Sequence, residues 1–399
     1  MNMILDAFVF AVKSIKHRKT RSWLTIVGIF IGVAAVVALI SLSQGMSAAI
    51  NEEFDKIGKD KIIIMPGISG GQQYGPSLGS SQLYKEDAET IEHVRGVEAV
   101  ETMLTQFSIV EFNGKEKPIG IFGASPSIYE SFPQFEIAEG RPLRENDHFK
   151  AVLGDTLATE TFDEKIQLRN SLKVDDHSIR VVGIMEPVGN PTDDKALMIP
   201  MNTARELFKK EDEVSTIYVD TDETFDIEEV KETIEDELED ERGTKDFSVQ
   251  TTEQIRESID NVLGLVQGLM LGIAALSLLV GGVGIMNTMY TSVLEKTREI
   301  GIMKSVGAKN SHILGIFLIE SGLIGVIGGI IGIILGAILG KVAEYGIIQM
   351  TGLSILEIAI TPELILGALA FSFGIGSLSG VLPARKAAKL KPTDSLRYE

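Results

Sequence analysis

Four long apolar runs constrain the fold of this chain more than any other feature of its sequence. The first extends from Trp23 to Leu42 without a charge, and the others cover Val262 to Val293, Ile313 to Gly340 and Leu364 to Leu382. Because an α-helix rises about 1.5 Å per residue, roughly 20 apolar residues cross the ~30 Å hydrocarbon core of a bilayer. Each run is therefore predicted to be a transmembrane helix. The first run is also too long for a signal-peptide core, so we expect it to be a retained anchor.

Basic residues cluster in three of the segments that flank these runs. They precede the first run, lie between the second and third, and follow the fourth: Lys13, Lys16, Arg18, Lys19, Arg21, Lys296, Arg298, Lys304, Lys309, Arg385, Lys386, Lys389, Lys391 and Arg397. By the positive-inside rule, these three segments face the cytoplasm. The sequence thus predicts a multi-pass protein of the cell (cytoplasmic) membrane with both termini cytoplasmic.

The large segment between the first and second runs, residues 44–260, is then extracytoplasmic. It holds 47 acidic and 22 basic residues, and such a surface does not suit nucleic acid, whose phosphates need a basic face. No nucleic-acid partner is expected. Strand-like runs (KIIIMPG, SIVEFNG, IGIFGA, SIRVVGIMEPV, ALMIPM, STIYVD) alternate with helix-like segments (YKEDAETIEHV, MNTARELFKK, FDIEEVKETIEDELED). The segment is therefore predicted to be an α+β domain. Its Gly/Ser-rich stretch 67–81 is expected to be either a mobile loop or a flap over a substrate or partner.

The sequence contains no motif for catalysis, metal binding or nucleotide binding. The chain has no Cys, its five His lack metal-ligand spacing, and no GxxxxGK[ST] phosphate-binding loop occurs. We therefore predict a chain that is not an enzyme, with no catalytic residue, no metal ligand and no cofactor of its own.

Two of the predicted helices are longer than a bilayer requires. The pattern from about Glu253 to Arg298 has no Pro, and the first run continues helically through Phe54. If neither helix breaks at an interior glycine such as Gly45 or Gly264, both form a stalk that could act as a lever.

Glycines recur at four-residue spacing in the predicted spans. The third contains Gly328, Gly332, Gly336 and Gly340, and the second contains the shorter series at 264, 268 and 272. Such faces let helix backbones approach closely, either within one subunit or across a homodimer. Glu320 is the one acid well inside a span, and we expect it to pair with Lys or Arg or to reach the interface.

The short loop VLEKTREIGIMKSVGAKN, residues 293–310, separates the second and third apolar runs. Ile300 and Met303 are apolar, Arg298, Glu299 and Lys304 are charged, and Gly307-Ala308 provides a turn. These residues predict a short amphipathic helix suited to docking in a groove of another protein.

Three stretches resemble one known family. The segments SVLEKTREIGIMKSVGAKNSHILGIFLIESGLIGVIGG, RSWLTIVGIFIGVAAVVALISL and PARKAAKLKPTDSLRYE are similar to those of MacB/FtsX-type ABC transporter permeases. The resemblance implies a permease subunit that transmits ATP-driven movement to its external domain, for export or extraction of amphiphilic compounds, peptides or lipoproteins. An FtsX-like regulator of an external hydrolase and a membrane sensor without an ATPase remain as alternatives.

The family resemblance also implies partners and site residues. The ATP and Mg²⁺ would be bound by a separate ABC ATPase subunit, which would contact the coupling residues Glu295, Arg298, Glu299, Ile302, Lys304, Gly307 and Ala308. A homodimer, an extracytoplasmic adaptor and membrane lipids are the other expected partners.

The predicted architecture has nine parts. They are an in-plane amphipathic elbow helix (1–21), transmembrane helix 1 (22–43), the extracytoplasmic α+β domain with helical stalk ends (44–260), transmembrane helix 2 (261–293), the cytoplasmic coupling helix (294–311), transmembrane helix 3 (312–340), an extracytoplasmic loop (341–362), transmembrane helix 4 (363–383) and a cytoplasmic basic tail (384–399).

Overall fold

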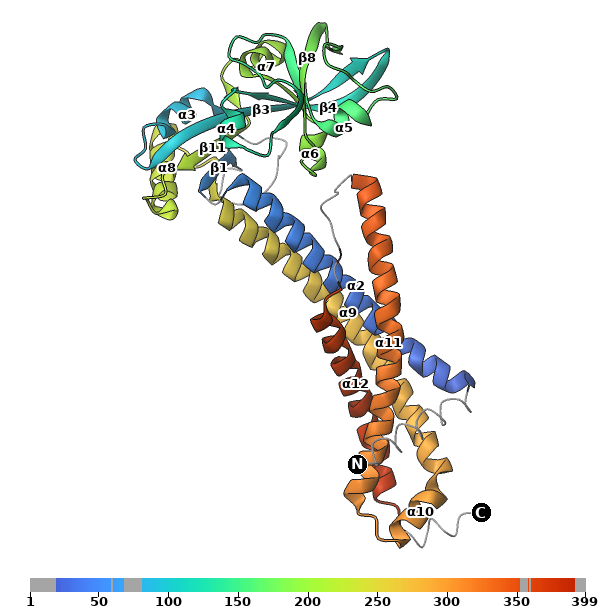
Figure 1. The fold of residues 1–399 in the computed structure, drawn as a ribbon. Helices are drawn as coiled ribbons and strands as arrows, with labels where there is room; N and C mark the ends of the chain where they lie inside the picture. The colour runs from blue at the N-terminus through green and yellow to red at the C-terminus, as the bar shows by residue number, and fades with distance from the viewer. Residues whose placement is uncertain (1–18, 59, 68–80, 352–357, 359, 392–399) are drawn as a thin grey trace. The chain divides into compact units, whose positions relative to one another are not determined.

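A computed structural model describes residues 19–58, 60–67, 81–351, 358 and 360–391 of the chain (Figure 1). It divides into two compact units. The helical unit contains the described parts of 1–47, 261–347 and 356–399, and the α+β unit contains those of 48–260 and 348–355.

Four long helices dominate the helical unit. They are α2 (Lys19–Ile57), α9 (Thr252–Glu295), α11 (Asn310–Thr351) and α12 (Pro362–Ala388). Among the described residues, these four are long and apolar enough to cross a membrane, which confirms the four predicted spans. The start of α12 follows its sequence: Pro362 occupies the first turn, and the Thr361 hydroxyl accepts a hydrogen bond from the Leu364 N–H.

Several helix limits differ from the predicted ones. Helix α11 continues to Thr351, so the predicted loop 341–362 is helical over its first eleven residues; Lys341–Thr351 contains no Pro to end the helix. The short helix α10 covers Thr297–Ser305 rather than 294–311, because its neighbours take up the ends of that range. Neither α2 nor α9 breaks at Gly45 or Gly264. The predicted elbow falls mostly on residues 1–18, which lie outside the described part of the chain, and α2 already includes residues 19–21.

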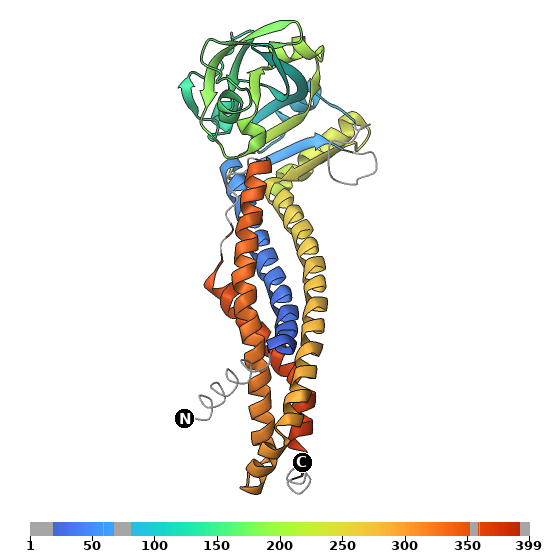
Figure 2. The same ribbon diagram turned by 90° about the vertical axis from the view of Figure 1, so that its right-hand side faces the viewer.

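Glycines bring α2 close to two other helices of this unit. A Cβ on Gly28 would lie 2.9 Å from the Gly281 Cα of α9, and a Cβ on Gly332 of α11 would lie 2.7 Å from the Val33 Cβ. Figures 1 and 2 both show α2 and α9 side by side within the helical unit. The buried core between the helices includes Ile29, Val33, Leu278 and Phe317.

The α+β unit is built on one mixed sheet and a short strand pair. Its strands are β1 (Lys61–Pro66), β2 (Leu83–Tyr84), β3 (Val97–Phe112), β4 (Lys115–Ala124), β5 (Ile137–Gly140), β6 (Lys150–Leu153), β7 (Ser171–Val174), β8 (His177–Met185), β9 (Leu197–Pro200), β10 (Glu213–Val214), β11 (Thr216–Thr221) and β12 (Phe247–Thr251). Within the described residues the main sheet runs β12-β1-β11-β3-β4-β9-β6-β8-β5, with β7 paired to β3 and β8. The unit confirms the predicted α+β class.

Strand β3 lies in the middle of this sheet and connects its two halves. Its first half pairs with β11, and its second half forms a hairpin with β4, in register from Met103↔Ala124 to Phe112↔Lys115. The turn is Asn113-Gly114, with φ of 49° and 76°, the backbone geometry that favours this dipeptide in two-residue hairpins.

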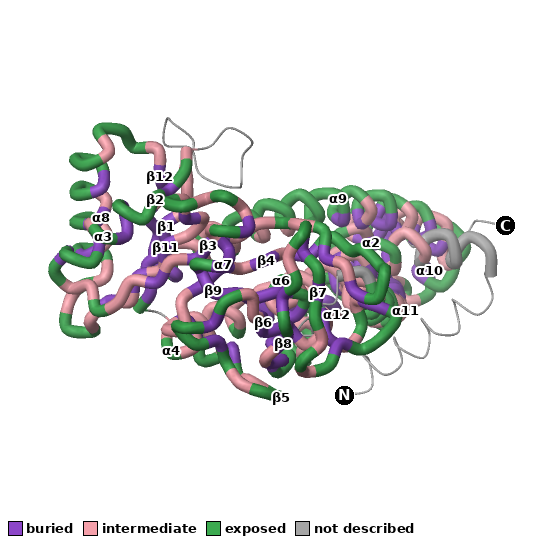
Figure 3. Tube along the Cα trace, turned by 90° about the horizontal axis from the view of Figure 1, so that it is seen from above, coloured by how far each residue is buried: buried purple, intermediate pink, exposed green. Residues whose placement is uncertain are grey.

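Six short helices accompany the sheet: α3 (Lys85–Ile91), α4 (Ile128–Ser131), α5 (Asp155–Thr159), α6 (Pro191–Asp194), α7 (Met201–Phe208) and α8 (Ile227–Arg242). Helix α8 confirms the helix-like segment FDIEEVKETIEDELED. Its apolar side is buried at Val230, Ile234 and Leu238, whereas its remaining surface is largely exposed (Figure 3). Asp226 caps the start of α8, and Gly243, with φ of 65°, ends it. A second core lies around Leu104, Leu153 and Ile199.

Candidate functional site: the α10 surface

Helix α10 presents one face to solvent and buries the other. Ile300 and Gly301 are buried, while Arg298 and Glu299 are exposed. Ile302 is 50% exposed and Val306 is 85% exposed. Because these positions are spaced by three or four residues, they form one stripe with apolar residues beside charges. We call Arg298, Glu299, Ile302 and Val306 the α10 face.

The other predicted coupling residues lie at the two ends of α10. Glu295 is exposed at the last position of α9. Gly307 has φ of 102°, its N–H donates to the Lys304 carbonyl, and the Ala308 N–H donates to the Met303 carbonyl. This pair of hydrogen bonds is the Schellman arrangement that ends a helix. Gly307 and Ala308 therefore terminate α10, in agreement with the turn that was predicted at these two residues.

The structure directs Lys304 inward, toward the same chain. Its Nζ donates to the carbonyl oxygens of Ala388, at 2.5 Å, and Leu390, at 2.7 Å, at the C-terminal end of α12. Helix C-terminal carbonyls carry partial negative charge that an ammonium group stabilises. Lys304 is thus separated from the exposed α10 face, although the sequence placed both in one docking element.

A buried ion pair holds the other end of α10. Lys296 is the single residue between α9 and α10, and its Nζ lies 2.9 Å from Oε1 of Glu320 on α11. The Lys296 side chain is 14% exposed and that of Glu320 is 7% exposed. The expected partner for Glu320 is therefore found. Lys296 and Val306 also belong to this region, although they were not among the predicted site residues. The signal for Lys296 was the one acid inside a span, and the signal for Val306 was its four-residue spacing from Ile302.

The glycine series of α11 lies inside the subunit. Gly328, Gly332, Gly336 and Gly340 are all buried. A Cβ on Gly336 would lie 2.7 Å from the Ala34 carbonyl oxygen of α2, and one on Gly340 would lie 3.5 Å from Ile358. In contrast, a Cβ on residues 264, 268 or 272 of α9 would meet nothing within 4 Å among the described residues.

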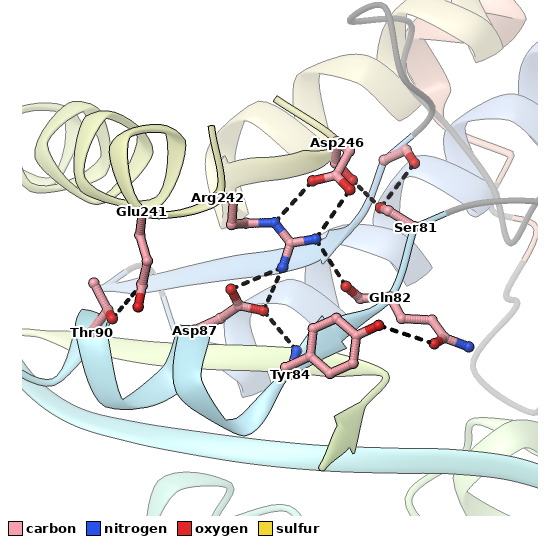
Figure 4. A network of polar contacts seen from close by, with 9 residues as sticks. Ser81, Gln82, Tyr84, Asp87, Thr90, Glu241, Arg242 and Asp246 are labelled. Carbon is pink, nitrogen blue, oxygen red and sulfur yellow. Dashed lines mark hydrogen bonds and ion pairs between the residues drawn. The ribbon is translucent and has the colours of Figure 1, made fainter. Parts of the chain in front are cut away.

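Polar contacts organise the α+β unit around Arg242. Its guanidinium donates to Asp87 at 2.7 and 2.9 Å and to Asp246 at 2.9 and 3.1 Å, and also to the Gln82 carbonyl (Figure 4). The hydrogen bond to Asp246 raises the pKa of Arg242, and the same contact lowers the pKa of Asp246. This network joins the end of α8 to the start of α3.

A second group of acids surrounds α6. Burial, followed by the charges of Glu53 and Asp194, raises the pKa of Asp193 from 3.8 to about 7. Asp194 accepts hydrogen bonds from the Val188 and Gly189 N–H groups, and Asn190 donates to Glu53 at 3.2 Å. In the described residues no group of three His, Cys, Asp or Glu side chains is arranged to hold a metal ion.

A groove of about 550 Å³ lies beside the β3–β4 hairpin, also in the α+β unit. Its wall includes Phe107, which is 79% exposed, with Phe122, Lys117 and Lys195. It combines aromatic rings with two lysines and one acid, Glu160. No sequence pattern indicated this groove, because its residues come from separate strands and helices.

Comparisons with known proteins cover nearly the whole chain. The model of the MacB-like periplasmic core domain matches residues 22–237, and that of the FtsX-like permease C-terminal matches residues 271–392. An uncharacterized ABC transporter permease of Methanocaldococcus jannaschii is 40% identical over 399 residues, covering 99% of this chain and 98% of that protein. The uncharacterized ABC transporter permease YknZ of Bacillus subtilis is 28% identical, covering 99% of this chain and 100% of its own length.

A longer relative is also similar. The macrolide export ATP-binding/permease protein MacB of Neisseria meningitidis is 29% identical over 405 residues, covering 100% of this chain, which spans 62% of MacB. The two matched ranges together overlap all four membrane helices and most of the α+β unit between the first two of them. The chain is therefore a multi-pass membrane protein and belongs to the MacB/FtsX-type family of ABC transporter permeases.

Proposed function

We propose that this chain is the non-catalytic permease subunit of an ABC transporter and that a separate ATPase subunit docks on the α10 face. ATP and Mg²⁺ would be bound by that partner, since the sequence has no phosphate-binding loop. Closure of the ATPase would move α10 and, through the long helices α2 and α9, the α+β unit. The export name of the MacB relative supports this assignment.

The exposure of the α10 face is the observation that carries the proposal. Ile302 and Val306 are apolar and largely exposed, next to Arg298 and Glu299. In the described part of the chain neither Arg298 nor Glu299 forms an ion pair. An apolar centre with charges at its edge is the composition of a docking helix, in which the charges fix the orientation of the partner.

The charge distribution supports an orientation with α10 in the cytoplasm. Basic residues flank α10 and follow α12, whereas the α+β segment is strongly acidic. Both termini would then be cytoplasmic in the cell membrane, and the α+β unit would be extracytoplasmic.

The groove beside the β3–β4 hairpin supports an amphiphilic substrate. Its aromatic rings suit an apolar body, and its charged residues Lys117, Lys195 and Glu160 suit a polar group. Export or extraction of amphiphilic compounds, peptides or lipoproteins is the activity we propose, with an extracytoplasmic adaptor as a further partner.

We also propose that the subunit forms a homodimer through α9. Helix α9 exposes Val262, Leu265, Leu269 and Leu276, and its glycines at 264, 268 and 272 are open to close approach. Residues 260–273 of this helix are mostly exposed (Figure 3). A second copy would cover the glycine side, and membrane lipids would cover the rest.

The docking proposal is tested by charge reversal on the α10 face. The full chain is purified from its native membrane in nanodiscs, and ATPase activity is measured in the eluate. The triple variant R298E/E299R/I302E should lower that activity by about tenfold or more, because three exposed contacts at one small interface are lost. Its thermal midpoint should stay near that of the wild type, since all three side chains are exposed.

The matched control is E232R, which reverses an exposed charge on α8. It should retain the wild-type ATPase activity in the eluate. Equal activity with the triple variant and with E232R would contradict docking at α10.

A further inference from the structure

Both ends of α10 are fastened to other helices of the same chain. At the start, the Lys296 ammonium lies 2.9 Å from the Glu320 carboxylate of α11. At the end, the Lys304 ammonium donates to the last carbonyl of α12, Ala388, and to that of Leu390. Each lysine therefore connects α10 to a different membrane helix.

These polar contacts lie on an otherwise apolar support. Ile300 of α10 belongs to a buried cluster with Ile313 and Phe317 of α11 and Ala384 and Ala387 of α12. Apolar contacts are non-directional, so burial of Ile300 selects the side of α10 that faces the bundle but does not fix the rotation closely. Charge-assisted hydrogen bonds depend on distance and angle, so they do fix it.

The Lys296–Glu320 ion pair is not expected to add much to the stability of the fold. Lys296 and Glu320 are both largely buried, and Oε2 of Glu320 is buried with no hydrogen-bond partner in the described residues. A buried pair must overcome the desolvation of both charges, and replacing both partners by apolar side chains is often neutral or stabilising. Removing a single partner is costly, because the other charge is left buried. A role in orientation accounts for the pair better than a role in stability does.

We propose that Lys296–Glu320 and Lys304 with the α12 carbonyls are positioning contacts for energy coupling. They set the rotation of α10 so that the α10 face points outward, and they pass a displacement of α10 to α11 and α12 together. The inference rests on the proposed docking of an ATPase at α10, but the rotation of α10 can be tested without the ATPase.

The test uses the double variant K296M/E320L in the full chain, in nanodiscs. It replaces both charged side chains by apolar side chains of similar length. We expect hydrogen exchange of the α10 amides, residues 297–305, to become about tenfold faster than in the wild type, while the thermal midpoint changes little.

Two further variants serve as controls. The swapped variant K296E/E320K should return exchange toward the wild-type rate, because it restores an ion pair. The control K341M removes an exposed lysine that pairs with Glu344 on the same α11, far from α10 in the sequence, and should leave α10 exchange unchanged.

Coupling is then measured on the same samples. With the ATPase co-purified, ATP should change hydrogen exchange in the α+β ends of the long helices, residues 48–57 and 252–260. In K296M/E320L this ATP-dependent change, normalised to the amount of ATPase that co-purifies, should fall by about tenfold, and Lys304→Met should act in the same direction.

The possible failures are distinguishable. Unchanged α10 exchange in K296M/E320L would overturn the positioning role, whether or not an ATPase is present. Faster α10 exchange with an undiminished ATP response would overturn the coupling role. Absence of ATPase from the wild-type eluate would contradict the proposed function, and the α10 exchange rates would still decide whether the ion pair orients the helix.

Discussion

Arg242 shows at the residue scale how one side chain can hold two elements together. It forms ion pairs with Asp87 of α3 and with Asp246 at the same time, and both carboxylates are largely buried. Arg242→Met should therefore destabilise the α+β unit by about 3–5 kcal/mol, since two buried charges lose their partner. Thermal unfolding of the full chain at pH 7.5 measures this effect. The loss should shrink at pH 5, where the orphaned carboxylates can take up protons.

The control for Arg242 is a similar residue in an exposed pair. Arg256 forms an ion pair with Glu253, whose side chain is 52% exposed, so Arg256→Met should cost less than about 1 kcal/mol. Similar destabilisation by both variants would mean that the buried network contributes no more than a surface pair.

Asp193 gives the α+β unit a predictable dependence on pH. Its pKa is raised from 3.8 to about 7, so between about pH 4 and 7 the folded state binds a proton that the unfolded state releases. Stability from this residue is thus present at low pH and is lost as pH rises through that window. Asp193→Asn, which mimics the protonated acid, should stabilise the unit by about 1–3 kcal/mol at pH 8 and have little effect at pH 4.

The measurement for Asp193 is thermal unfolding of the full chain at pH 4 and pH 8. Asp236→Asn makes the same chemical change at an exposed position of α8 and should show no such difference. A gain for Asp193→Asn that is equal at both pH values would contradict the assignment.

At the element scale, the sequence predicted elements whose pattern is local and missed those defined by distant partners. Helix α8 was predicted because its apolar residues recur at helical spacing within one segment. The first half of β3 was missed, since it is recognisable only by its pairing with β11, about 115 residues away along the chain. The short strands β5 and β6 were missed for the same reason, because both pair with strands that are distant in the sequence. Strand β7 was also missed, although its partner β8 is adjacent in the sequence.

The same limit applied to α10. The sequence predicted an amphipathic helix and its terminating Gly307, because spacing and turn residues are local signals. It could not predict that Lys304 reaches the α12 carbonyls, because that contact joins residues 84 and 86 positions apart. Charge alone placed Lys304 with Arg298, whereas the direction of the side chain separates them.

At the scale of the whole molecule, the glycines of α9 and α11 have different surroundings, and this difference predicts where two subunits meet. A Cβ on Gly332 would clash with Val33 at 2.7 Å and with the Phe30 carbonyl at 2.9 Å, whereas a Cβ on Gly268 would meet nothing within 4 Å in the described residues. Gly332→Ile should therefore destabilise the subunit itself, by about 1–3 kcal/mol or more, because it overpacks the contact with α2. Gly268→Ile should leave the thermal midpoint of the monomer unchanged and lower the dimer fraction by about tenfold if the copies meet at this face.

Cross-linking and mass measurement in nanodiscs, over a range of protein-to-lipid ratios, give the dimer fraction of each variant. Leu279→Ala is a suitable control, because Leu279 is exposed on the same α9 but lies beyond the glycine series. It should change neither the dimer fraction nor the thermal midpoint. An unchanged dimer fraction in Gly268→Ile, with a normal midpoint, would place the interface elsewhere and leave the exposed α9 residues in contact with lipid. A dimer fraction that is lowered in Gly268→Ile but not in Leu279→Ala would locate the second subunit on α9, since Gly332 and Gly336 of α11 already pack against α2.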